Sequence, residues 1–386
     1  MLVLPALISE DRRPGLEKRV GELYNKVYGL GMAPHIERIA QDVAKAIAHP
    51  NDVSEYYIEV AEEDAKVADA RHPKRRWRTQ RIFKYLDSVF EMEVDGKLLK
   101  LEEEGAIHCE KLGTLLMLIA CRYHRINDIP WGDTKPSDYV HKGYWHDIAK
   151  AVPQIFNVIA PGKPLSNDEF EIVRLHPFVS YLIIERAADL LEGQEDIPNL
   201  SGVANTVLYH HEDYDGNGYP FGLIGEEIPY ASRLIRLGDG LIAAARDRKH
   251  KPGYRLEVVR HEAYRCAIGA EEDPVDAILR GGNERRLSSY IAMSNGLAPE
   301  QVIYLKIDKN TKGGRLFPTD GMLLEPDGLP PLFVSSYQEI TTALHIKYLS
   351  EAYLKVREIR EGQFDGKLVP LVLGCITEKP DLVLNN

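Results

Sequence analysis

Residues 210–229 read HHEDYDGNGYPFGLIGEEIP, and no other stretch of this chain is as informative. Two adjacent histidines and a glutamate follow directly on an apolar helical pattern, and a glycine-rich loop with a Gly-Tyr-Pro corner comes after them. Upstream lies a second pair of metal-type side chains, His146 and Asp147, with Lys150 one helical turn further on. Imidazole and carboxylate ligands on two separate helices favour a multi-metal hydrolytic centre over a structural zinc site.

The composition is that of an ordinary soluble globular protein. Of the 386 residues, 44% are hydrophobic and 28% are charged, which leaves ample chain for a sizeable core. The net charge of −11 argues against a protein built to hold DNA or RNA. A bound nucleotide therefore needs a local cluster of basic side chains or a metal.

The cysteines and the apolar runs predict a cytoplasmic protein without a membrane partner. The four cysteines have no Cys-x-x-Cys spacing, which suits a reducing compartment and argues against a thiolate zinc site. The opening MLVLPALISE has no basic residue ahead of its apolar stretch and is a poor signal peptide. The longest apolar run, residues 112–121, is too short to cross a bilayer.

The N-terminal hundred residues have a helical pattern with one hairpin signal. Asp95-Gly96 stands between Val94 and Leu98, where it predicts a tight turn. Apolar side chains recur at helical spacing in three stretches, residues 16–28, 36–48 and 54–68. We place a domain boundary near residue 100.

The next segment, to about residue 282, is again helical. Ser166 and Glu169 form a capping box, which starts a helix that runs to Leu175. Pro177 suits the first turn of a following helix, so the break between the two helices is predicted at His176. Residues 283–386 change character, with a helix predicted at 338–360 and a strand at 368–375.

The sequence HDIAK, residues 146–150, places three functional groups within little more than one helical turn. Adjacent helical residues point about 100° apart, so His146 and Asp147 can address neighbouring metals while Lys150 returns to the same face. A carboxylate can bridge two metals, whereas an imidazole binds one. A His-Asp pair alone is more often a surface pair, and here its weight comes from the other histidines and acids in the segment.

These residues resemble the HD superfamily of metal-dependent phosphohydrolases. Residues 210–229 match the pattern HHExxDGxGYPxGLxGxxIP of its HD-GYP branch at every specified position. The resemblance covers roughly residues 101–282, about half of the chain. It implies an all-helical domain that hydrolyses the bacterial messenger cyclic di-GMP at a centre of two or three metals, with either pGpG or GMP as the end product.

Carried over position by position, the resemblance implies a set of metal ligands: His108, His146, Asp147, His176, His210, His211 and Asp239. Glu104, four residues before His108, stands where some family members hold a third metal. The alternative for Glu104 is an acid favoured by the dipole at a helix start. A ligand set without sulfur suits iron, with manganese as the second choice.

The resemblance also implies catalytic and substrate-binding residues. Asp147 would bridge the metals, and Lys150 would contact the substrate phosphate and protonate or stabilise the leaving alkoxide. A surface salt bridge is the alternative for Lys150. Gly218 and Tyr219 would lie beside a guanine base, although glycine pairs of this kind are also ordinary turns. Two basic residues downstream would hold the second phosphate, Arg248 and Lys251.

The chain departs from the family pattern at several positions. Ala149 and Ser180 stand where the family has glycine. Ile242 removes an acid near the substrate, and Lys249-His250 replace a Pro-Tyr corner. These changes leave open a phosphodiesterase for another cyclic dinucleotide, such as cyclic GMP-AMP. A non-catalytic cyclic di-GMP receptor is the third interpretation, disfavoured because every ligand position of the two-metal pattern is filled.

The predicted fold class is mainly α. We expect an N-terminal helical regulatory domain at residues 1–100, an HD-type helical bundle at 101–282, and an α+β segment of unknown role at 283–386. The Gly-Tyr-Pro loop is also a candidate contact for a diguanylate cyclase or an adaptor protein, as in the family. A homodimer is compatible with the sequence.

Overall fold

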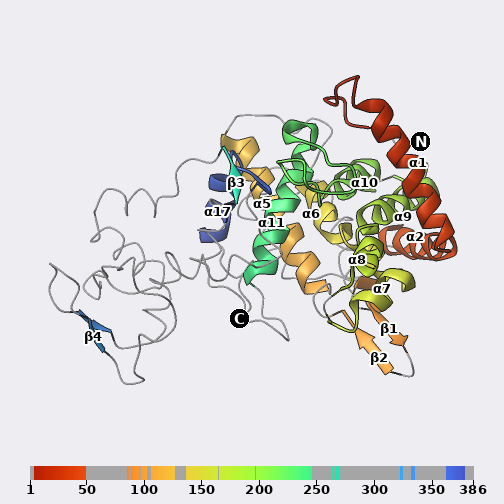
Figure 1. Cartoon of the computed structure of the whole chain (residues 1–386), viewed down its shortest axis with the longest axis horizontal. Coiled ribbons are helices and arrows are strands. Elements are labelled where there is room, and N and C mark those ends of the chain that lie inside the picture. Colours follow the sequence, from red (N-terminus) through yellow and green to blue (C-terminus); the bar gives the residue numbers. More distant parts are fainter. Residues whose placement is uncertain are drawn as a thin grey trace.

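The computed structural model describes residues 4–48, 85–86, 88–94, 97–101, 106–126, 136–163, 165–195, 197–245, 263, 266–269, 322–324, 332–334 and 362–378. Within these ranges the chain is mainly helical, which confirms the predicted fold class at that level (Figure 1). None of the helices in these ranges combines the length and the apolar character that a bilayer crossing requires.

Two N-terminal helices, α1 (Arg13–Gly29) and α2 (Ala33–Ala48), confirm the first two predicted helical stretches. Pro14 lies in the first turn of α1, where its missing N–H costs no helical hydrogen bond. α2 buries Ile39, Val43 and Ile47 at helical spacing and packs mainly against α9 (His176–Leu190). The third predicted stretch, 54–68, lies outside the described residues.

The predicted hairpin is present. β1 (Glu91–Val94) and β2 (Lys97–Lys100) pair antiparallel, with Glu91 opposite Lys100 and Val94 opposite Lys97. The Asp95-Gly96 turn itself lies outside the described residues.

The middle of the chain is a bundle of helices. Its elements in order are α5 (Ala106–Ile126), α6 (Pro136–Trp145), η3 (Ile148–Ala151), α7 (Pro153–Ile159), α8 (Asn167–Val173), α9, α10 (Leu200–Leu208), η4 (Gly225–Glu227) and α11 (Tyr230–Ala245). α5 packs along α6, and α9 along α10. One hydrophobic cluster joins α6, α7, α9 and α10 to the N-terminal helices, and a second joins α5 and α11 to the C-terminal segment. The domain boundaries expected from the sequence stay predictions.

Local signals set the start of α8 and α9. Ser166 Oγ accepts a hydrogen bond from the Glu169 N–H at 3.2 Å, and Glu169 Oε2 accepts one from the Ser166 N–H at 2.8 Å, which is the predicted capping box. Pro177 lies in the first turn of α9, as predicted. The predicted break at His176 is wrong by one to two residues: Arg174 and Leu175 separate the helices, and His176 is the first residue of α9.

The predicted strand at 368–375 is wrong, because Val369–Glu378 form the helix α17. A short, continuous apolar run does not distinguish a buried strand from a buried helix. Pro370 was the available signal, since proline suits a first helical turn and is confined to edges in a sheet. α17 packs against α5 and α11 (Figure 1).

Two further short pairs of strands complete the described structure. β6 (Phe364–Asp365) pairs in parallel with β3 (Ala267–Ile268), next to α17. β4 (Met322–Leu324) and β5 (Leu332–Val334) pair antiparallel. The helix predicted at 338–360 lies outside the described residues.

Candidate metal centre

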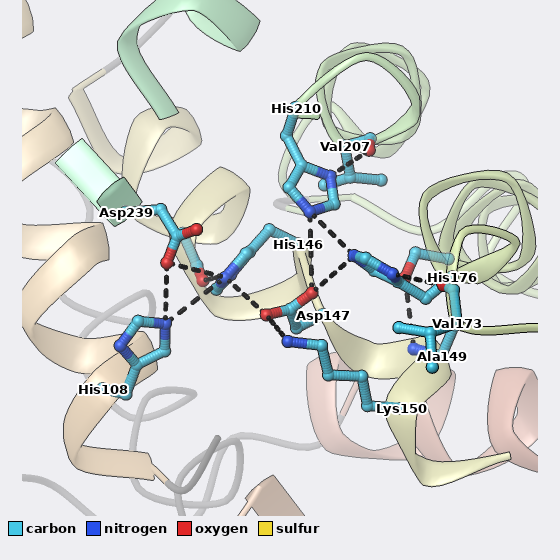
Figure 2. Close-up of polar contacts among 12 residues, drawn as sticks. His108, His146, Asp147, Ala149, Lys150, Val173, His176, Val207, His210 and Asp239 are labelled. Atoms are coloured by element: carbon cyan, nitrogen blue, oxygen red, sulfur yellow. Dashed lines mark hydrogen bonds and ion pairs between the residues drawn. The ribbon is translucent and has the colours of Figure 1, made fainter. Parts of the chain in front are cut away.

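The bundle brings ligand-type side chains from five places in the sequence to one point (Figure 2). They lie in the first turn of α5, directly after α6, at the start of α9, directly after α10 and within α11. Their ligand atoms form two groups, each with all atoms within 4.8 Å of one another: Asp147, His176, His210 and His211 in one, and His108, His146 and Asp147 in the other.

Three of the histidines are oriented in the same way. The Nδ1 atoms of His146, His176 and His210 each lie against the backbone carbonyl three residues earlier, at 2.8, 2.8 and 2.5 Å. A carbonyl oxygen can only accept, so Nδ1 carries the proton and donates it. Each Nε2 then presents a lone pair to the centre of the site, which is the form of imidazole that binds a metal.

Asp147 stands between the two groups, with one carboxylate oxygen toward each. Oδ1 lies 3.0 Å from His176 Nε2 and 3.5 Å from His210 Nε2, whereas Oδ2 lies 3.0 Å from His146 Nε2 (Figure 2). Asp147 is 2% exposed, so water does not compensate its charge. A carboxylate in this position can bridge two cations.

His108 and Asp239 close the second group. His108 Nε2 lies 3.4 Å from His146 Nε2 and 3.3 Å from Asp239 Oδ1. Asp239 Oδ1 is also 3.9 Å from His146 Nε2. The carboxylate of α11 therefore faces the histidines of α5 and of the turn after α6.

The electrostatics of the site favour the metal-binding forms of its side chains. Burial lowers the pKa of His210 to about 4 and the pKa of His211 well below its usual value, so both imidazoles are neutral at pH 7. Burial alone would raise the pKa of Asp147, but His146 and Lys150 outweigh it and the net pKa is well below the usual range. The pKa of Asp239 is also lowered, since His108 and His146 overcome its burial.

The contacts between lone pairs test whether a cation fits here. His176 Nε2 and His210 Nε2 face each other at 3.2 Å, and both face Asp147 Oδ1. Among the described residues, Asp147 Oδ1 accepts no hydrogen bond although it is buried. Acceptor atoms gathered around a point repel one another unless a positive charge lies between them. The donor set is imidazole and carboxylate without sulfur, so these residues fit a pair of divalent cations.

Lys150 reaches the site by a different route from the predicted one. α6 ends at Trp145, and Ile148–Ala151 form the 3₁₀-helix η3, in which the Lys150 N–H donates to the Asp147 carbonyl at 2.9 Å. The α-helical register expected for residues 146–150 is therefore wrong. In a 3₁₀ turn residues i and i+3 eclipse, and Lys150 Nζ donates to Asp147 Oδ2 at 2.7 Å.

Two departures from the family pattern contact each other. Ser180 is fully buried in α9, and its Oγ accepts a hydrogen bond from the Ala149 N–H at 3.1 Å. This bond ties η3 to the helix that begins with His176. The serine thus satisfies a buried donor beside the centre.

The Gly-Tyr-Pro loop, residues 213–229, lies against the first group of candidate ligands. Tyr219 stacks on His211, with ring centroids 4.8 Å apart and planes at 14°, and its N–H donates to the His211 carbonyl at 3.0 Å. The peptide bond before Pro220 is cis. A Cβ on Gly218 would lie 2.1 Å from the Asp213 nitrogen, so the close approach of the loop backbone already requires glycine there.

Glu212 and Arg236 are residues of the site region to which the sequence assigned no role. Glu212 is 1% exposed and accepts hydrogen bonds from the Phe221 and Leu223 N–H groups at 2.7 and 2.9 Å, while its burial raises its pKa to about 7. Arg236 pairs with Asp213 at 2.8 Å in the interior. Its position one helical turn before Asp239 was the available signal.

Some of the predicted site residues cannot be placed. Glu104, Arg248 and Lys251 lie outside the described residues. Ile242 is described and is 2% exposed, in the hydrophobic cluster of α5 and α11.

The chain is similar in sequence to known proteins over this region. Residues 139–259 match the model of the HD domain family. The cyclic di-GMP phosphodiesterase response regulator RpfG of Xanthomonas campestris is 36% identical over 139 residues, 35% of this chain and 34% of that protein. The cyclic di-GMP phosphodiesterase PA4108 of Pseudomonas aeruginosa is 39% identical over 124 residues, 31% of this chain and 27% of that protein.

A relative with a different named substrate is also similar. The 3'3'-cGAMP-specific phosphodiesterase 2 of Vibrio cholerae is 31% identical over 119 residues, 30% of this chain and 21% of that protein. The chain therefore spans about a fifth to a third of the length of these curated relatives.

Proposed function

We propose that this chain, which contains an HD domain at residues 139–259, is a metal-dependent phosphodiesterase that hydrolyses cyclic di-GMP. The observation that carries the proposal is the Asp147 carboxylate, buried between two groups of histidines with one oxygen toward each. Asp147 and the histidines of the two groups would hold two divalent cations there, which would supply the chemistry of two-metal phosphodiester hydrolysis. The named activity of the relatives RpfG and PA4108 supports cyclic di-GMP as the substrate.

The proposed ligands of the metals are the residues of the two groups together with Asp239. When bound, two divalent cations supply a hydroxide at neutral pH and neutralise charge on the phosphodiester. Glu104 is proposed for a third cation. Iron is proposed as the metal and manganese as its substitute, because the donor atoms are nitrogen and oxygen alone.

The proposed role of Lys150 is to hold a proton near the reacting phosphate. Its Nζ lies on Asp147 Oδ2, so its ammonium group is at the edge of the candidate metal site and is still partly exposed. From there it can contact a phosphate oxygen and stabilise or protonate the leaving alkoxide. Tyr219 and Gly218 are proposed to border a guanine base, and Arg248 and Lys251 to hold the second phosphate.

Cyclic GMP-AMP is the second candidate substrate. The similarity to a 3'3'-cGAMP-specific phosphodiesterase motivates it, together with Ile242 in place of a family acid. An interaction of the Gly-Tyr-Pro loop with a diguanylate cyclase or adaptor, and a homodimer, stay predictions from the sequence.

The first experiment measures metal content and turnover together. The full chain is purified without oxygen, loaded with Fe(II) or Mn(II), and analysed for metal by elemental analysis. It is then offered cyclic di-GMP, cyclic GMP-AMP and cyclic di-AMP, and the products are separated by chromatography. We expect at least two metals per chain and linear pGpG from cyclic di-GMP, with GMP as the product to test for at long times. Tight binding of cyclic di-GMP by fully metallated protein without turnover would instead make the chain a receptor.

Paired substitutions separate the two proposed roles at Asp147 and Lys150. Asp147→Ala should lower metal content and abolish turnover, because it removes the shared ligand. Lys150→Ala should keep the metals and lower kcat, because its proposed contact is with substrate. Asp189→Ala and Lys163→Ala, both on exposed side chains, are the matched controls. Loss of metal without loss of turnover in Lys150→Ala would contradict the assignment.

A further inference from the structure

Three basic residues follow one another at intervals of seven along α1. Arg12 directly precedes the first residue of α1, Arg19 is two turns on, and Lys26 lies in the last turn. Seven residues advance a helix by almost two full turns, so the three side chains lie on one face. α1, red in Figure 1, runs along the outer side of the bundle and precedes the segment that matches the HD domain.

The first two of these residues contact the Gly-Tyr-Pro loop. Arg12 Nη2 donates to the Gly222 carbonyl at 2.8 Å, and its other terminal nitrogen pairs with Glu227 at the end of the loop. Arg19 Nε donates to the Pro220 carbonyl at 3.3 Å. Both guanidinium groups therefore bind backbone carbonyls of the loop.

The same short stretch of loop is held from its other side by Glu212. The carbonyls of Pro220 and Gly222 accept from α1, while the N–H groups of the alternate residues, Phe221 and Leu223, donate to the buried Glu212 carboxylate. Within one trans peptide unit the C=O and the N–H point in opposite directions, so each side of the stretch has its own partner. The backbone hydrogen bonds of this stretch are complete only when both the arginines and Glu212 are in place.

The third basic residue is connected to the same loop by a chain of side-chain contacts that passes through α8. Lys26 Nζ donates to Glu171 Oε2 at 3.1 Å, and Glu171 Oε1 accepts from Arg174 at 2.9 Å. The Arg174 guanidinium lies 5.1 Å from the centre of the Tyr219 ring, within cation–π range. Tyr219 itself stacks on the candidate ligand His211.

We propose that α1 is a strap that fixes the position of the Gly-Tyr-Pro loop, with Arg12 and Arg19 as positioning residues for substrate binding. The part of this proposal that concerns substrate rests on the proposed function. α1 keeps its place through Leu16, Leu23 and Val27 in the core, so loss of the basic side chains frees the loop without releasing the helix. The candidate ligands lie on other helices, so the metals stay bound and the loop that carries Tyr219 moves.

The test compares two double variants of the full chain. Arg12→Ala/Arg19→Ala removes the contacts with the loop. Arg13→Ala/Lys18→Ala removes the same charge from the same helix, where Arg13 bonds only to the carbonyls of Pro5 and Ala6 and Lys18 pairs with Glu22 among the described residues. Amide hydrogen exchange of the loop peptide, metal content, thermal unfolding, KM and kcat are measured for both.

The strap predicts a specific pattern of results. In the Arg12/Arg19 variant the loop amides exchange faster, KM for cyclic di-GMP rises on the order of ten-fold, and kcat and metal content stay within about two-fold. The control variant matches the wild type, and Arg19→Lys with Arg12 intact stays near it. A purely structural role would instead lower the unfolding temperature without a separation of KM from kcat.

The outcomes distinguish this inference from the proposed function. If the wild type turns over substrate and the Arg12/Arg19 variant keeps both its KM and its loop protection, the strap is wrong. If the wild type shows no turnover, the proposed activity fails, and amide exchange of the loop tests the strap by itself. Faster exchange in the Arg12/Arg19 variant alone would then support the strap. Unchanged exchange would overturn the strap as well.

Discussion

His146, His176 and His210 show at the scale of single atoms how the backbone orients the imidazoles of the candidate metal centre. In each, the proton on Nδ1 is held by the backbone carbonyl three residues earlier, in the last helical turn or at the helix junction. The tautomer is therefore set by the backbone and not by a bound ion. This arrangement explains why the histidines follow or begin a helix: only there does a free carbonyl lie within reach of the ring.

Lys142 carries a buried ammonium group whose loss of hydration is only partly offset by a nearby acid. It is 8% exposed, it lies 4.0 Å from the centre of the Tyr139 ring, and burial lowers its pKa to about 8 although Asp138 acts in the other direction. Between pH 8 and the unfolded pKa of about 10.5, the unfolded chain holds a proton that the folded chain has lost. Stability therefore rises with pH in this window, by at most roughly 3 kcal/mol.

The Lys142 contribution is measurable with one substitution. The free energy of unfolding of the wild type and of Lys142→Met is determined in urea at pH 7.5 and at pH 9.5. We expect the free energy of unfolding of the wild type to rise relative to that of Lys142→Met as the pH rises. Methionine keeps the packing and does not titrate, so the change reports on Lys142. A difference that is the same at both pH values would show that Lys142 keeps an ordinary pKa.

At the scale of elements, α8 depends on its cap more than the longer helices do. It has seven residues and none of them is buried, so packing contributes little to it. The capping box of Ser166 and Glu169 supplies partners for two N–H groups at its start. α8 also carries Glu171, which contacts both Lys26 and Arg174.

Ser166→Ala should therefore destabilise the protein by about 1 kcal/mol, the usual effect of losing a helix N-cap. Ser166→Thr keeps the hydroxyl and should stay close to the wild type. Both variants are compared by urea denaturation, with amide exchange of the α8 peptide as a local measure. Equal stability of the alanine and threonine variants would mean that the cap contributes nothing.

At the scale of the whole molecule, the two ends of the described chain meet the same loop. Arg12 and Arg19 contact it from α1, and on the C-terminal side the carbonyls of Gly362 and Gln363 accept from the Asp215 and Tyr214 N–H groups at 3.0 and 3.1 Å. Asp365 also pairs with Arg233 at the start of α11, and Lys367 with Glu226 at 2.9 Å. The loop beside the candidate metal centre is thus held by segments far outside the matched HD domain.

Gly362→Ala tests the C-terminal contact. Gly362 has a φ of +87°, and a Cβ there would lie 2.4 Å from Asp215 Oδ2. We expect a loss of about 1–3 kcal/mol in the free energy of unfolding from strain and the clash. Gly15 lies in α1, and nothing lies within 4 Å of a carbon added there. Gly15→Ala should therefore raise the free energy of unfolding, because alanine favours a helix. A Gly362→Ala variant as stable as the wild type would show that the loop and the C-terminal segment do not depend on this contact.

Local sequence signals were enough to predict the features that depend on residues close together in the chain. Ser166, Glu169 and Pro177 set helix starts, and the Asp95-Gly96 signal came with paired strands, because backbone dihedrals and hydrogen bonds a few residues apart are properties of the local chain. The candidate ligands were recognisable from their residue types and their order along the chain, because both are properties of the sequence.

Features that join distant segments could be seen only in the folded chain. Val369–Glu378 form a helix because α5 and α11 offer it an apolar surface, which a continuous apolar run alone does not reveal. The contact of Lys150 with Asp147 depends on the tight turn η3, whose buried Ala149 N–H is satisfied by Ser180 on another helix. Arg12 and Arg19 contact a loop some two hundred residues away. Such contacts depend on how whole helices pack, and packing energy is shared among many side chains that no short stretch of sequence contains.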